Sequence, residues 1–395
     1  MKIVYVARKF LEGFAYQDNE LADMHARLGH EVTVITSQSD DSSLYFDMSL
    51  IKKSKAVSSK KKSADFRIIR LPLKHKVNFR FWEFKNLIST LEEIEPDLIF
   101  FHGSPMFCLL DLAKYKKKHP GITLVMDCHN DYNNAGHGIV SRVLMHKIIY
   151  RSIIYKTRNE VDLYYYLAPN IRIFMKDMYR IPDRKLKFLP RGGILENMDF
   201  ANEVKIRREI REQLHIGTDD VVVISGGKLD SKKMSHHLCE AINDLNKPNV
   251  HLILFGTVDK NYEEQLQKAV NGNPKIHLIG WIASENVYNY FFASDIACFP
   301  GGHSVMWEQA ICCGLPLIVK DWYKGMYYLN VKRNVLLLED SDVRYIKPAL
   351  SSLIDHPELR VEMSLNARNE GQKFFSYRRI AESILADTRL KIKNQ

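Results

Sequence analysis

The sequence predicts an α/β protein made of two doubly wound domains, in each of which helices wrap a parallel sheet. Short apolar runs alternate with helix-length segments along all 395 residues, as parallel strands alternate with their crossover helices. Each half of the chain holds enough apolar runs for one sheet. A polar segment near residue 195 separates the two sets, which indicates a domain junction there.

Seven apolar runs predict the strands of the first domain, and six predict those of the second. The first set covers residues 2–7, 31–36, 66–71, 97–102, 122–127, 161–168 and 186–190. The second set covers residues 220–225, 250–256, 275–280, 295–300, 315–319 and 334–339. We therefore expect a first domain over 1–195, a second over 196–373 and an amphipathic helix within 374–395.

The composition, with 46% hydrophobic and 26% charged residues, is that of a globular protein. No apolar run approaches the ~20 residues of a membrane-spanning helix, and the basic residues of the first ten positions do not precede a signal-peptide core. These features predict a cytoplasmic protein. The six cysteines form no CxxC pair, so we interpret them as reduced core residues rather than ligands or nucleophiles. They are Cys108, Cys128, Cys239, Cys298, Cys312 and Cys313.

The positive charge is concentrated in one region. The chain carries a net charge of +10, and residues 51–90 hold twelve Lys and Arg against two Asp and Glu. They form either a solvated loop and helix face or a surface for anionic lipid headgroups or a phosphorylated substrate. Residues 141–159, with five basic and no acidic residues among aromatic ones, suit a helix lying on a bilayer surface. No nucleic-acid reader motif accompanies the charge, so we expect no nucleic-acid partner.

The segment "SDIACFPGGHSVMWEQAICCGLPLIV" (294–319) predicts an anion site at the start of a helix. After its strand, Gly301 and Gly302 allow a close turn and Ser304 can cap the helix. The N–H groups of that helix favour an anion, typically a phosphate. Glu308 lies on the same helical face and can accept hydrogen bonds from the vicinal hydroxyls of a ribose. The alternative is an ordinary helix start with an exposed Glu.

The segment "VVVISGGKLDSKKMSHHLCEAI" predicts a cationic loop after another strand of the same sheet. Gly226 and Gly227 end the strand, and Lys228 and Lys233 follow within a short loop. Two cations at the mouth of the cleft expected between the domains can neutralise a leaving diphosphate without a metal ion. The alternative is that both lysines are solvated.

Two histidines follow strands of the first domain. His129 comes after the strand in "LVMDCHNDYNNAGHG", and His102 after the strand in "FFHGSP". A histidine at such a place can exchange hydrogen bonds with a sugar hydroxyl, and a structural role in a hydrogen-bonded loop is the alternative.

Two further motifs bear on cofactors. Gly13 lies in the first strand-to-helix turn, but the GxGxxG fingerprint of dinucleotide cofactors is absent and no acidic residue ends the second strand, which disfavours an NAD-dependent enzyme. Asp340 and Asp342 form a DxD string, which we assign to helix capping rather than to a metal. We expect neither a metal nor another cofactor.

The chain resembles, over essentially its whole length, the retaining glycosyltransferases of family 4. "LADMHARLGHEVTVIT" is similar to the first crossover of that family, and "GGKLDSKKM" to its Gly-Arg-Leu-Asp…Lys donor-phosphate motif. "GWIASENVYNYFFASDIACFP" followed by "EQAICCGLPLIV" is similar to its signature region. The resemblance implies the GT-B fold of two Rossmann-like domains facing across a cleft, a nucleotide-sugar donor and no metal.

The resemblance also implies roles for individual residues. Lys228 and Lys233 would bind the diphosphate, Glu308 the ribose, and His129 would be the active-site histidine; these four are the expected catalytic residues. The expected donor-binding residues are Gly13, Gly227, Ile282, Gly301, Gly302, His303, Ser304, Val305 and Glu308, with Ile282 against the base. The C-terminal helix would cross back onto the first domain.

Two positions depart from the family pattern. Pro300 stands where the family has the first carboxylate of its Glu-x7-Glu motif, and Lys228 replaces an arginine, which keeps the charge but not the bidentate fork. We expect His303 to fill the place of the missing carboxylate.

Within the family, "GFAYQDNELA", "FFHGSP" and "HNDYNNA" look most like enzymes of bacterial capsule or other surface polysaccharides. The expected reaction is retaining transfer of a hexose or related sugar from a UDP-sugar to a hydroxyl of a glycan or polyprenyl-diphosphate-linked saccharide. The expected place is the inner face of the cytoplasmic membrane, as a peripheral protein. The alternatives are a UDP-sugar 2-epimerase and a catalytically silent partner of a transferase.

Overall fold

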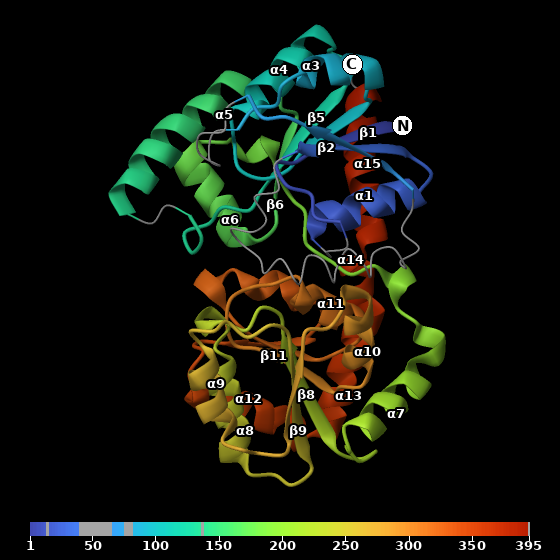
Figure 1. The fold of residues 1–395 in the computed structure, drawn as a ribbon, viewed down its shortest axis with the longest axis vertical. Helices are drawn as coiled ribbons and strands as arrows, with labels where there is room; N and C mark the ends of the chain where they lie inside the picture. The colour runs from blue at the N-terminus through green and yellow to red at the C-terminus, as the bar shows by residue number, and fades with distance from the viewer. Residues whose placement is uncertain (13–15, 39–64, 75–81, 136–137, 394–395) are drawn as a thin grey trace. The chain divides into compact units, whose positions relative to one another are not determined.

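The computed structural model describes residues 1–12, 16–38, 65–74, 82–135 and 138–393. Gly13 and most of the basic region 51–90 lie outside the described residues, so the predictions made for them stay predictions. The chain forms two compact units, which are drawn in Figure 1. The first contains Met1–Pro190 and Ile380–Gln395, and the second contains Arg191–Arg379.

The first unit is built on a seven-stranded parallel sheet with the strand order β3-β2-β1-β4-β5-β6-β7. The strands are β1 (Lys2–Val6), β2 (Glu31–Ser37), β3 (Arg67–Leu71), β4 (Leu98–Phe101), β5 (Thr123–Cys128), β6 (Leu163–Tyr166) and β7 (Leu186–Phe188). All seven predicted strands are present, although the run 161–168 is a strand only over its four central residues. Phe101 on β4 pairs with Val6 on β1 and with Met126 on β5, so the loops after these strands leave the same edge of the sheet.

Helices cover this sheet, and the end of the chain returns to it. They are α1 (Gln17–Arg27), α3 (Leu87–Ile94), α4 (Cys108–Lys118), the π-helical η2 (Val140–Tyr150) continued by α5 (Arg151–Thr157), α6 (Pro169–Phe174), η3 (Met175–Tyr179) and α15 (Tyr377–Lys393). Helices α1 and α15 lie side by side in Figure 1. Nε2 of His25 on α1 donates to the carbonyl of Ala381 on α15 over 3.1 Å, and the Tyr165 hydroxyl donates to Asp387 over 2.8 Å. Polar contacts that are buried or partly buried therefore hold α15 on the first unit.

The second unit has a six-stranded parallel sheet with the strand order β10-β9-β8-β11-β12-β13. The strands are β8 (Val221–Gly226), β9 (Val250–Phe255), β10 (Ile276–Gly280), β11 (Ile296–Phe299), β12 (Leu317–Lys320) and β13 (Val335–Leu338). All six predicted strands are again present. Because β8 and β11 are neighbours, the two predicted glycine turns leave the sheet side by side. The prediction of two doubly wound parallel sheets is confirmed.

The helices of the second unit enclose its core. They are α7 (Glu203–Gln213), α8 (Ser235–Leu245), α9 (Glu263–Val270), α10 (Val287–Phe292), α11 (Met306–Cys312), α12 (Val343–Ile354), α13 (Pro357–Asn366) and α14 (Gln372–Phe375). Apolar side chains of α8, α9 and α12 pack with those of β8, β9 and β11 in one buried cluster. Helix α7 packs beside α10.

Three smaller predictions concern the cysteines, the cap of a helix and membrane-spanning helices. All six cysteines are buried, as expected of core residues. The Asp342 carboxylate caps α12 by accepting a hydrogen bond of 2.9 Å from the backbone N–H of Arg344, which confirms the capping role. No described helix combines the length and the apolar character that crossing a bilayer requires.

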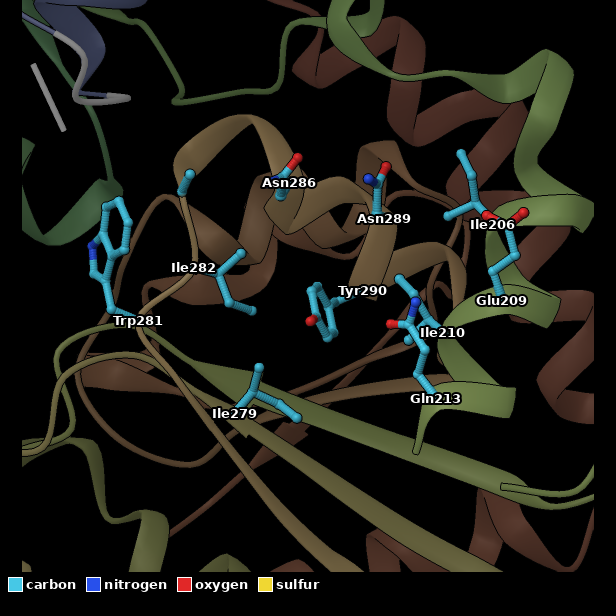
Figure 2. Close-up of a pocket in the computed structure, with 11 residues that line it drawn as sticks. Ile206, Glu209, Ile210, Gln213, Ile279, Trp281, Ile282, Asn286, Asn289 and Tyr290 are labelled. Atoms are coloured by element: carbon cyan, nitrogen blue, oxygen red, sulfur yellow. The ribbon is translucent and has the colours of Figure 1, made fainter. Parts of the chain in front are cut away.

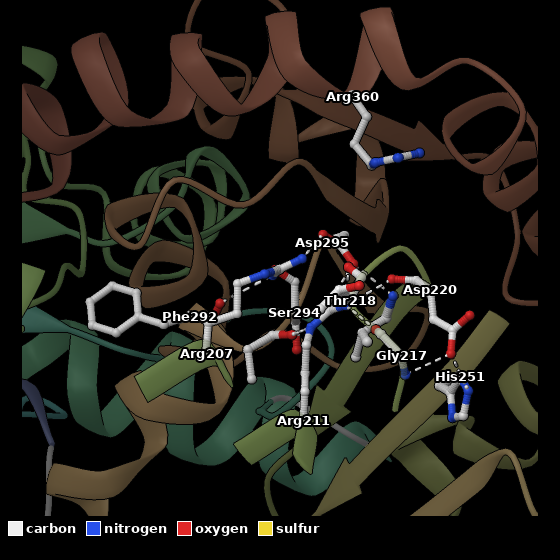
Figure 3. A network of polar contacts seen from close by, with 12 residues as sticks. Arg207, Arg211, Gly217, Thr218, Asp220, His251, Phe292, Ser294, Asp295 and Arg360 are labelled. Carbon is white, nitrogen blue, oxygen red and sulfur yellow. Dashed lines mark hydrogen bonds and ion pairs between the residues drawn. The ribbon is translucent and has the colours of Figure 1, made fainter. Parts of the chain in front are cut away.

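A partly buried ion pair fastens α7 to the sheet of the second unit, and Figure 3 shows the network around it. Arg211 on α7 donates to Asp295 over 2.7 Å, and the same carboxylate oxygen accepts the backbone N–H of Val222 on β8. Arg211 also donates to the carbonyls of Ala293, Gly217, Thr218 and Asp220. Arg207, one turn earlier, donates to the second oxygen of Asp295 over 2.6 Å. The Arg211 guanidinium thus donates hydrogen bonds to several backbone carbonyls, which an apolar side chain could not do.

We predict that Arg211→Ala lowers the free energy of unfolding by about 3 kcal/mol, because it removes a partner from a partly buried carboxylate and leaves the carbonyls unpaired. Urea unfolding measures the change. Arg208→Ala is the matched control on the same helix, since that side chain is exposed and 3.9 Å from Glu212. It should change the free energy by less than about 0.5 kcal/mol. Equal losses for both variants would contradict the assigned role of the network.

Candidate functional site

In the second unit, the loop after β8 touches the loop after β11. The Gly302 N–H donates to the Lys232 carbonyl over 2.9 Å, and the Lys233 ammonium donates to the Gly302 carbonyl over 2.8 Å. A Cβ at Gly301 would lie 2.3 Å from the carbonyl carbon of Lys233, which no real Cβ tolerates. Only glycine therefore permits this approach. These contacts bring Gly301, Gly302 and Lys233 together, while their role in binding a donor stays a prediction.

The two predicted lysines have different surroundings. Burial lowers the pKa of Lys233 to about 8, helped by the nearby Arg191 and opposed by Asp230. Lys228 is exposed over 61% of its side chain, and its amine lies 3.7 Å from the Asp259 carboxylate. Lys233 is thus the ammonium fixed at the glycine turn, and Lys228 lies in a solvated ion pair of little energetic weight.

A second pair of glycines shapes the loop after β8. Gly227 has a φ of +112° and Gly256 a φ of +122°, both in the region that side chains disfavour. A Cβ at Gly256 would lie 1.7 Å from the Gly227 carbonyl oxygen. The loop that carries Lys228 and Lys233 therefore packs backbone to backbone on the loop after β9.

Glu308 lies on α11 and has no solvent-exposed surface. Its Oε1 accepts a hydrogen bond of 3.0 Å from Nε2 of His303 and one of 2.8 Å from the Tyr328 hydroxyl. Burial alone would raise the pKa of Glu308, but His303, Arg191 and the Tyr328 hydroxyl lower it below its usual value. The alternative of an exposed Glu at an ordinary helix start is wrong, because the carboxylate is enclosed and kept ionised.

His303 links this carboxylate to Arg191. The Arg191 guanidinium donates over 3.1 Å to Nδ1 of His303, while Nε2 of the same ring faces Glu308. Burial lowers the pKa of His303, and the positive charges of Arg191 and Lys233 lower it further against the effect of Glu308. A guanidinium only donates and a carboxylate only accepts, so the ring is neutral with its proton on Nε2. His303 thus orients Glu308.

Three polar atoms between Ser304 and Glu308 are buried and have no hydrogen-bond partner among the described residues. They are Oγ of Ser304, Nε1 of Trp307 and Oε2 of Glu308. Buried polar groups of native proteins are nearly always paired, so each of these atoms can exchange a hydrogen bond with a ligand or a water. One of the three is an oxygen of an ionised carboxylate, which favours a hydroxyl donor.

The structure corrects the prediction that Ser304 caps the helix. Helix α11 begins at Met306, its N-cap is Val305, and no side chain caps it. The Ser304 hydroxyl therefore stands ahead of the helix, one residue before its N-cap. Pro300, at the position of the missing carboxylate, contributes its carbonyl, which accepts a hydrogen bond of 2.6 Å from Ser341.

Ile282 lines a different feature of the second unit, a pocket of about 570 Å³ beside the end of β10. Its other walls come from α7 and α10, as Figure 2 shows. Tyr290 and Ile282 point into this pocket, and Trp281 lies at its rim. The lining shares no residue with the cluster around Glu308, so the contact of Ile282 with a base stays a prediction.

In the first unit, His102 and His129 meet at the Asp127 carboxylate. Nδ1 of His102 lies 2.8 Å and Nε2 of His129 lies 3.1 Å from the same oxygen, Oδ2, and Gly103 N–H donates to Oδ1 over 2.8 Å. Burial alone would raise the pKa of Asp127, but the two histidines lower it well below its usual value. The three ligand-type atoms lie within 4.8 Å of one another, a spacing that a metal ion could also use.

Hydrogen bonds also order the loop that carries His129. Asp131 Oδ1 accepts the backbone N–H groups of Asn133 and Asn134, and the Asn134 amide donates to the His129 carbonyl over 2.7 Å. Asn170 on α6 donates to the second oxygen of Asp131 over 2.7 Å. The histidine is therefore held in place both at its ring and at its backbone.

Two family models match the chain, one for each half. The model for glycosyltransferase family 4 matches residues 19–196, and the model for glycosyl transferases group 1 matches residues 206–370. The chain is a GT-B glycosyltransferase.

Curated and solved relatives agree with this family, at low sequence identity. The α-monoglucosyldiacylglycerol synthase of Acholeplasma laidlawii is 21% identical over 303 residues, which are 74% of this chain and 73% of the relative. A glycosyltransferase from Rickettsia africae has a TM-score of 0.73 at 14% identity, over 100% of this chain and 99% of that one. Anabaena HepE, solved with UDP and glucose, has a TM-score of 0.66 at 15% identity, over 98% of both chains.

The clusters around Glu308 and around the two histidines contain four residues of the glycosyltransferase that the sequence did not indicate. They are Arg191, Trp307, Tyr328 and Asp127. The sequence does contain a signal for Asp127, because an acidic residue ends an apolar run two positions before His129. Tyr328 is twenty residues from Glu308 and follows no motif, so only the fold reveals it.

We predict that Gly301→Ala disrupts the glycosyltransferase at this turn, because its Cβ would overlap the Lys232–Lys233 backbone. The cost should be about 1–3 kcal/mol of unfolding free energy, measured by urea denaturation. Gly302→Ala is the control, because its nearest neighbour would be the Lys232 carbonyl oxygen at 3.8 Å. A tolerated Gly301→Ala, or equal damage from both changes, would contradict the close approach.

Proposed function

We propose that this glycosyltransferase transfers a sugar from a nucleotide diphosphate sugar, UDP-linked, to a hydroxyl of a glycan or lipid-linked saccharide, with retention at the anomeric carbon and without a metal. The acceptor belongs to the synthesis of a bacterial surface polysaccharide such as a capsule. Two observations carry the proposal. The partly buried Lys233 ammonium is held at the glycine turn, and the ionised, enclosed Glu308 has one oxygen without a partner among the described residues.

The arrangement suits a diphosphate and its ribose. Lys233 supplies a positive charge beside the glycine turn, where little water competes with a phosphate oxygen. Oε2 of Glu308 accepts from a ribose hydroxyl, while His303 and Tyr328 hold the other oxygen. Ser304 Oγ lies in the same turn and offers a further partner. Lys228 adds a solvated charge rather than a directed contact.

The proposed reaction breaks one bond and forms one on the same face of the sugar. The bond from the anomeric carbon to the β-phosphate oxygen breaks, and its electron pair stays on the diphosphate, where Lys233 stabilises the charge. The acceptor oxygen bonds to the anomeric carbon, and its proton moves to the departing phosphate oxygen. His129 contacts the sugar in this proposal.

Two relatives support parts of this proposal. HepE was solved with UDP and glucose, which supports a nucleotide-sugar donor of the UDP type. The relative from Acholeplasma is named for a glucosylated diacylglycerol, which supports a lipid-linked acceptor. The donor sugar should be identified first, by screening nucleotide sugars for slow hydrolysis.

We predict that affinity for UDP falls about tenfold between pH 7 and pH 9, because Lys233, with a pKa of about 8, loses its proton over that interval. Calorimetric titration measures the affinity. Lys233→Arg stays charged and should bind UDP with little dependence on pH. Lys233→Met should bind roughly 10–100-fold more weakly at pH 7, the value of a charge-assisted hydrogen bond.

Lys268→Met on α9 is the control for losing a lysine, since that side chain is exposed in a pair with Glu264. If Lys233→Met leaves UDP binding and turnover unchanged, the proposal is wrong. A new nucleotide sugar formed without acceptor would indicate an epimerase instead. UDP binding without any transfer or hydrolysis would indicate a silent partner of another transferase.

We also propose that the helix formed by η2 and α5 rests on an anionic membrane surface as a peripheral anchor. The exposed apolar side chains of this helix and of its N-cap are Ile139, Val140, Val143, Leu144, Ile148 and Tyr155. Residues 141–159 carry five basic and no acidic side chains. An apolar face flanked by cations suits the interface of an anionic bilayer.

We predict that Leu144→Glu with Ile148→Glu reduces the fraction that floats with phosphatidylglycerol-containing vesicles by about tenfold, because two inserted apolar side chains become anionic. Val361→Glu with Leu365→Glu is the control, as these side chains are equally apolar and exposed on α13 of the other unit. If the floated fraction does not change with lipid charge, with salt or with the first pair of substitutions, the proposed membrane surface is wrong.

A further inference from the structure

Arg191 belongs to a segment that packs closely on the second unit. The Gly193 N–H donates to the Phe375 carbonyl over 3.0 Å, and the Gly193 carbonyl accepts the Tyr377 N–H over 3.0 Å. A Cβ at Gly193 would lie 3.2 Å from the Cβ of Cys312 on α11, so the absence of a side chain allows this approach. These contacts hold the segment of Arg191 against the helix of the candidate site.

The Arg191 guanidinium uses one of its three nitrogens within the protein. Nη1 donates to Nδ1 of His303 over 3.1 Å. Among the residues that the structure describes, Nε and Nη2 have no hydrogen-bond partner, and no carboxylate lies within ion-pair distance. Arg368 in the same unit differs, because both of its terminal nitrogens donate to the Glu203 carboxylate. The guanidinium of Arg191 therefore has donors left for a ligand.

A second cation, Lys233, lies near Arg191. Burial and the charge of Arg191 lower the pKa of Lys233, although Asp230 opposes them. Burial lowers the pKa of His303, Glu308 opposes this, and the two cations lower the pKa further. The two positive charges thus act on one partly buried place, where water screens their repulsion less than at the surface. An anion with several negatively charged oxygens would offset that repulsion.

We propose that Arg191, together with Lys233, binds the diphosphate of the nucleotide-sugar donor through Nε and Nη2. This inference rests on the proposed glycosyl transfer and adds a substrate-binding residue to it. A guanidinium presents parallel N–H groups that match two oxygens of one phosphate, which an ammonium cannot do. Lys228 is solvated and does not supply such a directed contact.

Two other roles for Arg191 make different predictions. If Arg191 only fixes the tautomer of His303, its loss disturbs Glu308 and weakens the binding of any ligand with a ribose, including uridine. If Arg191 binds the carboxylate of an acidic sugar, its loss weakens UDP-glucuronate and leaves UDP unchanged. Uridine, UDP and UDP-glucuronate are therefore probes that separate the three roles.

The test compares the full chain with its Arg191→Gln variant at pH 7, by calorimetric titration with UDP and by NMR titration with uridine. Glutamine keeps a donor for Nδ1 of His303 but removes the charge. We expect the affinity for UDP to fall roughly 10–100-fold, the value of a charge-assisted hydrogen bond, and the affinity for uridine to change less than about twofold. An equal fall for both ligands, an unchanged affinity for UDP, or a fall confined to UDP-glucuronate would each overturn the proposal.

Two further variants separate charge from geometry. Arg208→Gln is the matched control, because it removes the same charge from a side chain on α7 that is 67% exposed. It should leave both affinities unchanged. Arg191→Lys keeps the charge but not the fork, so it should recover part of the affinity for UDP that Arg191→Gln loses. If Arg191→Lys binds UDP no better than Arg191→Gln, the assigned role of the charge is wrong.

Phenylglyoxal, which modifies arginine side chains, tests the unmodified protein and does not depend on a variant that folds. Arg191 is partly exposed, so the reagent can reach it. We expect saturating UDP to protect Arg191 but not Arg208, and uridine to protect neither, as measured by mass spectrometry of the peptides. Protection of Arg191 by uridine, or no protection by UDP, would contradict the proposed contact.

Failure of this inference can be told apart from failure of the proposed function. If the unmodified chain does not bind UDP, the nucleotide-sugar proposal itself fails. If UDP binds and Lys233→Met weakens it while Arg191→Gln does not, only the role of Arg191 fails.

Discussion

The contact between Gly301 and the Lys232–Lys233 backbone is the constraint on which the candidate site of the second unit depends. Parallel pairing of β8 and β11 brings the two loops to one sheet edge, and the missing side chain lets them touch. That contact fixes the Gly302 carbonyl, which in turn holds the Lys233 ammonium. A flexible cation is thereby turned into a directed one, and its partial burial is what lowers its pKa. The position of the charge that would bind a phosphate is therefore a consequence of backbone packing.

Burial also decides how the acids of the two units behave. Glu308 and Asp127 are both fully buried, where an isolated carboxylate would take up a proton. In each case histidine neighbours keep the carboxylate ionised. The difference lies in what remains unpaired. Asp127 receives hydrogen bonds at both oxygens, while Glu308 keeps one oxygen without a partner among the described residues. The first therefore suits a supporting residue, and the second suits a residue that receives a ligand.

Much of the site could be anticipated from the sequence because it follows strand ends. Gly301, Gly302 and Glu308 sit in a strand-turn-helix pattern, and Lys233 sits in the loop of the adjacent strand. The predicted cap at Ser304 was wrong, since propensity alone cannot tell where a turn ends and a helix begins. Lys228 and Lys233 looked equivalent in the sequence, and only their packing separates a solvated ion pair from a partly buried ammonium that donates to a backbone carbonyl.

The sequence by itself determined the two parallel sheets, because buried strands need apolar runs and the helices between them need longer amphipathic ones. All thirteen predicted strands are present. It also determined which turns carry glycine and charge. Only the tertiary structure decided which distant side chains complete each cluster. Tyr328 and Arg191 reach Glu308 and His303 from elements far along the chain. Hydrogen-bond partners, burial and pKa values depend on those three-dimensional neighbours, and no local pattern of residues records them.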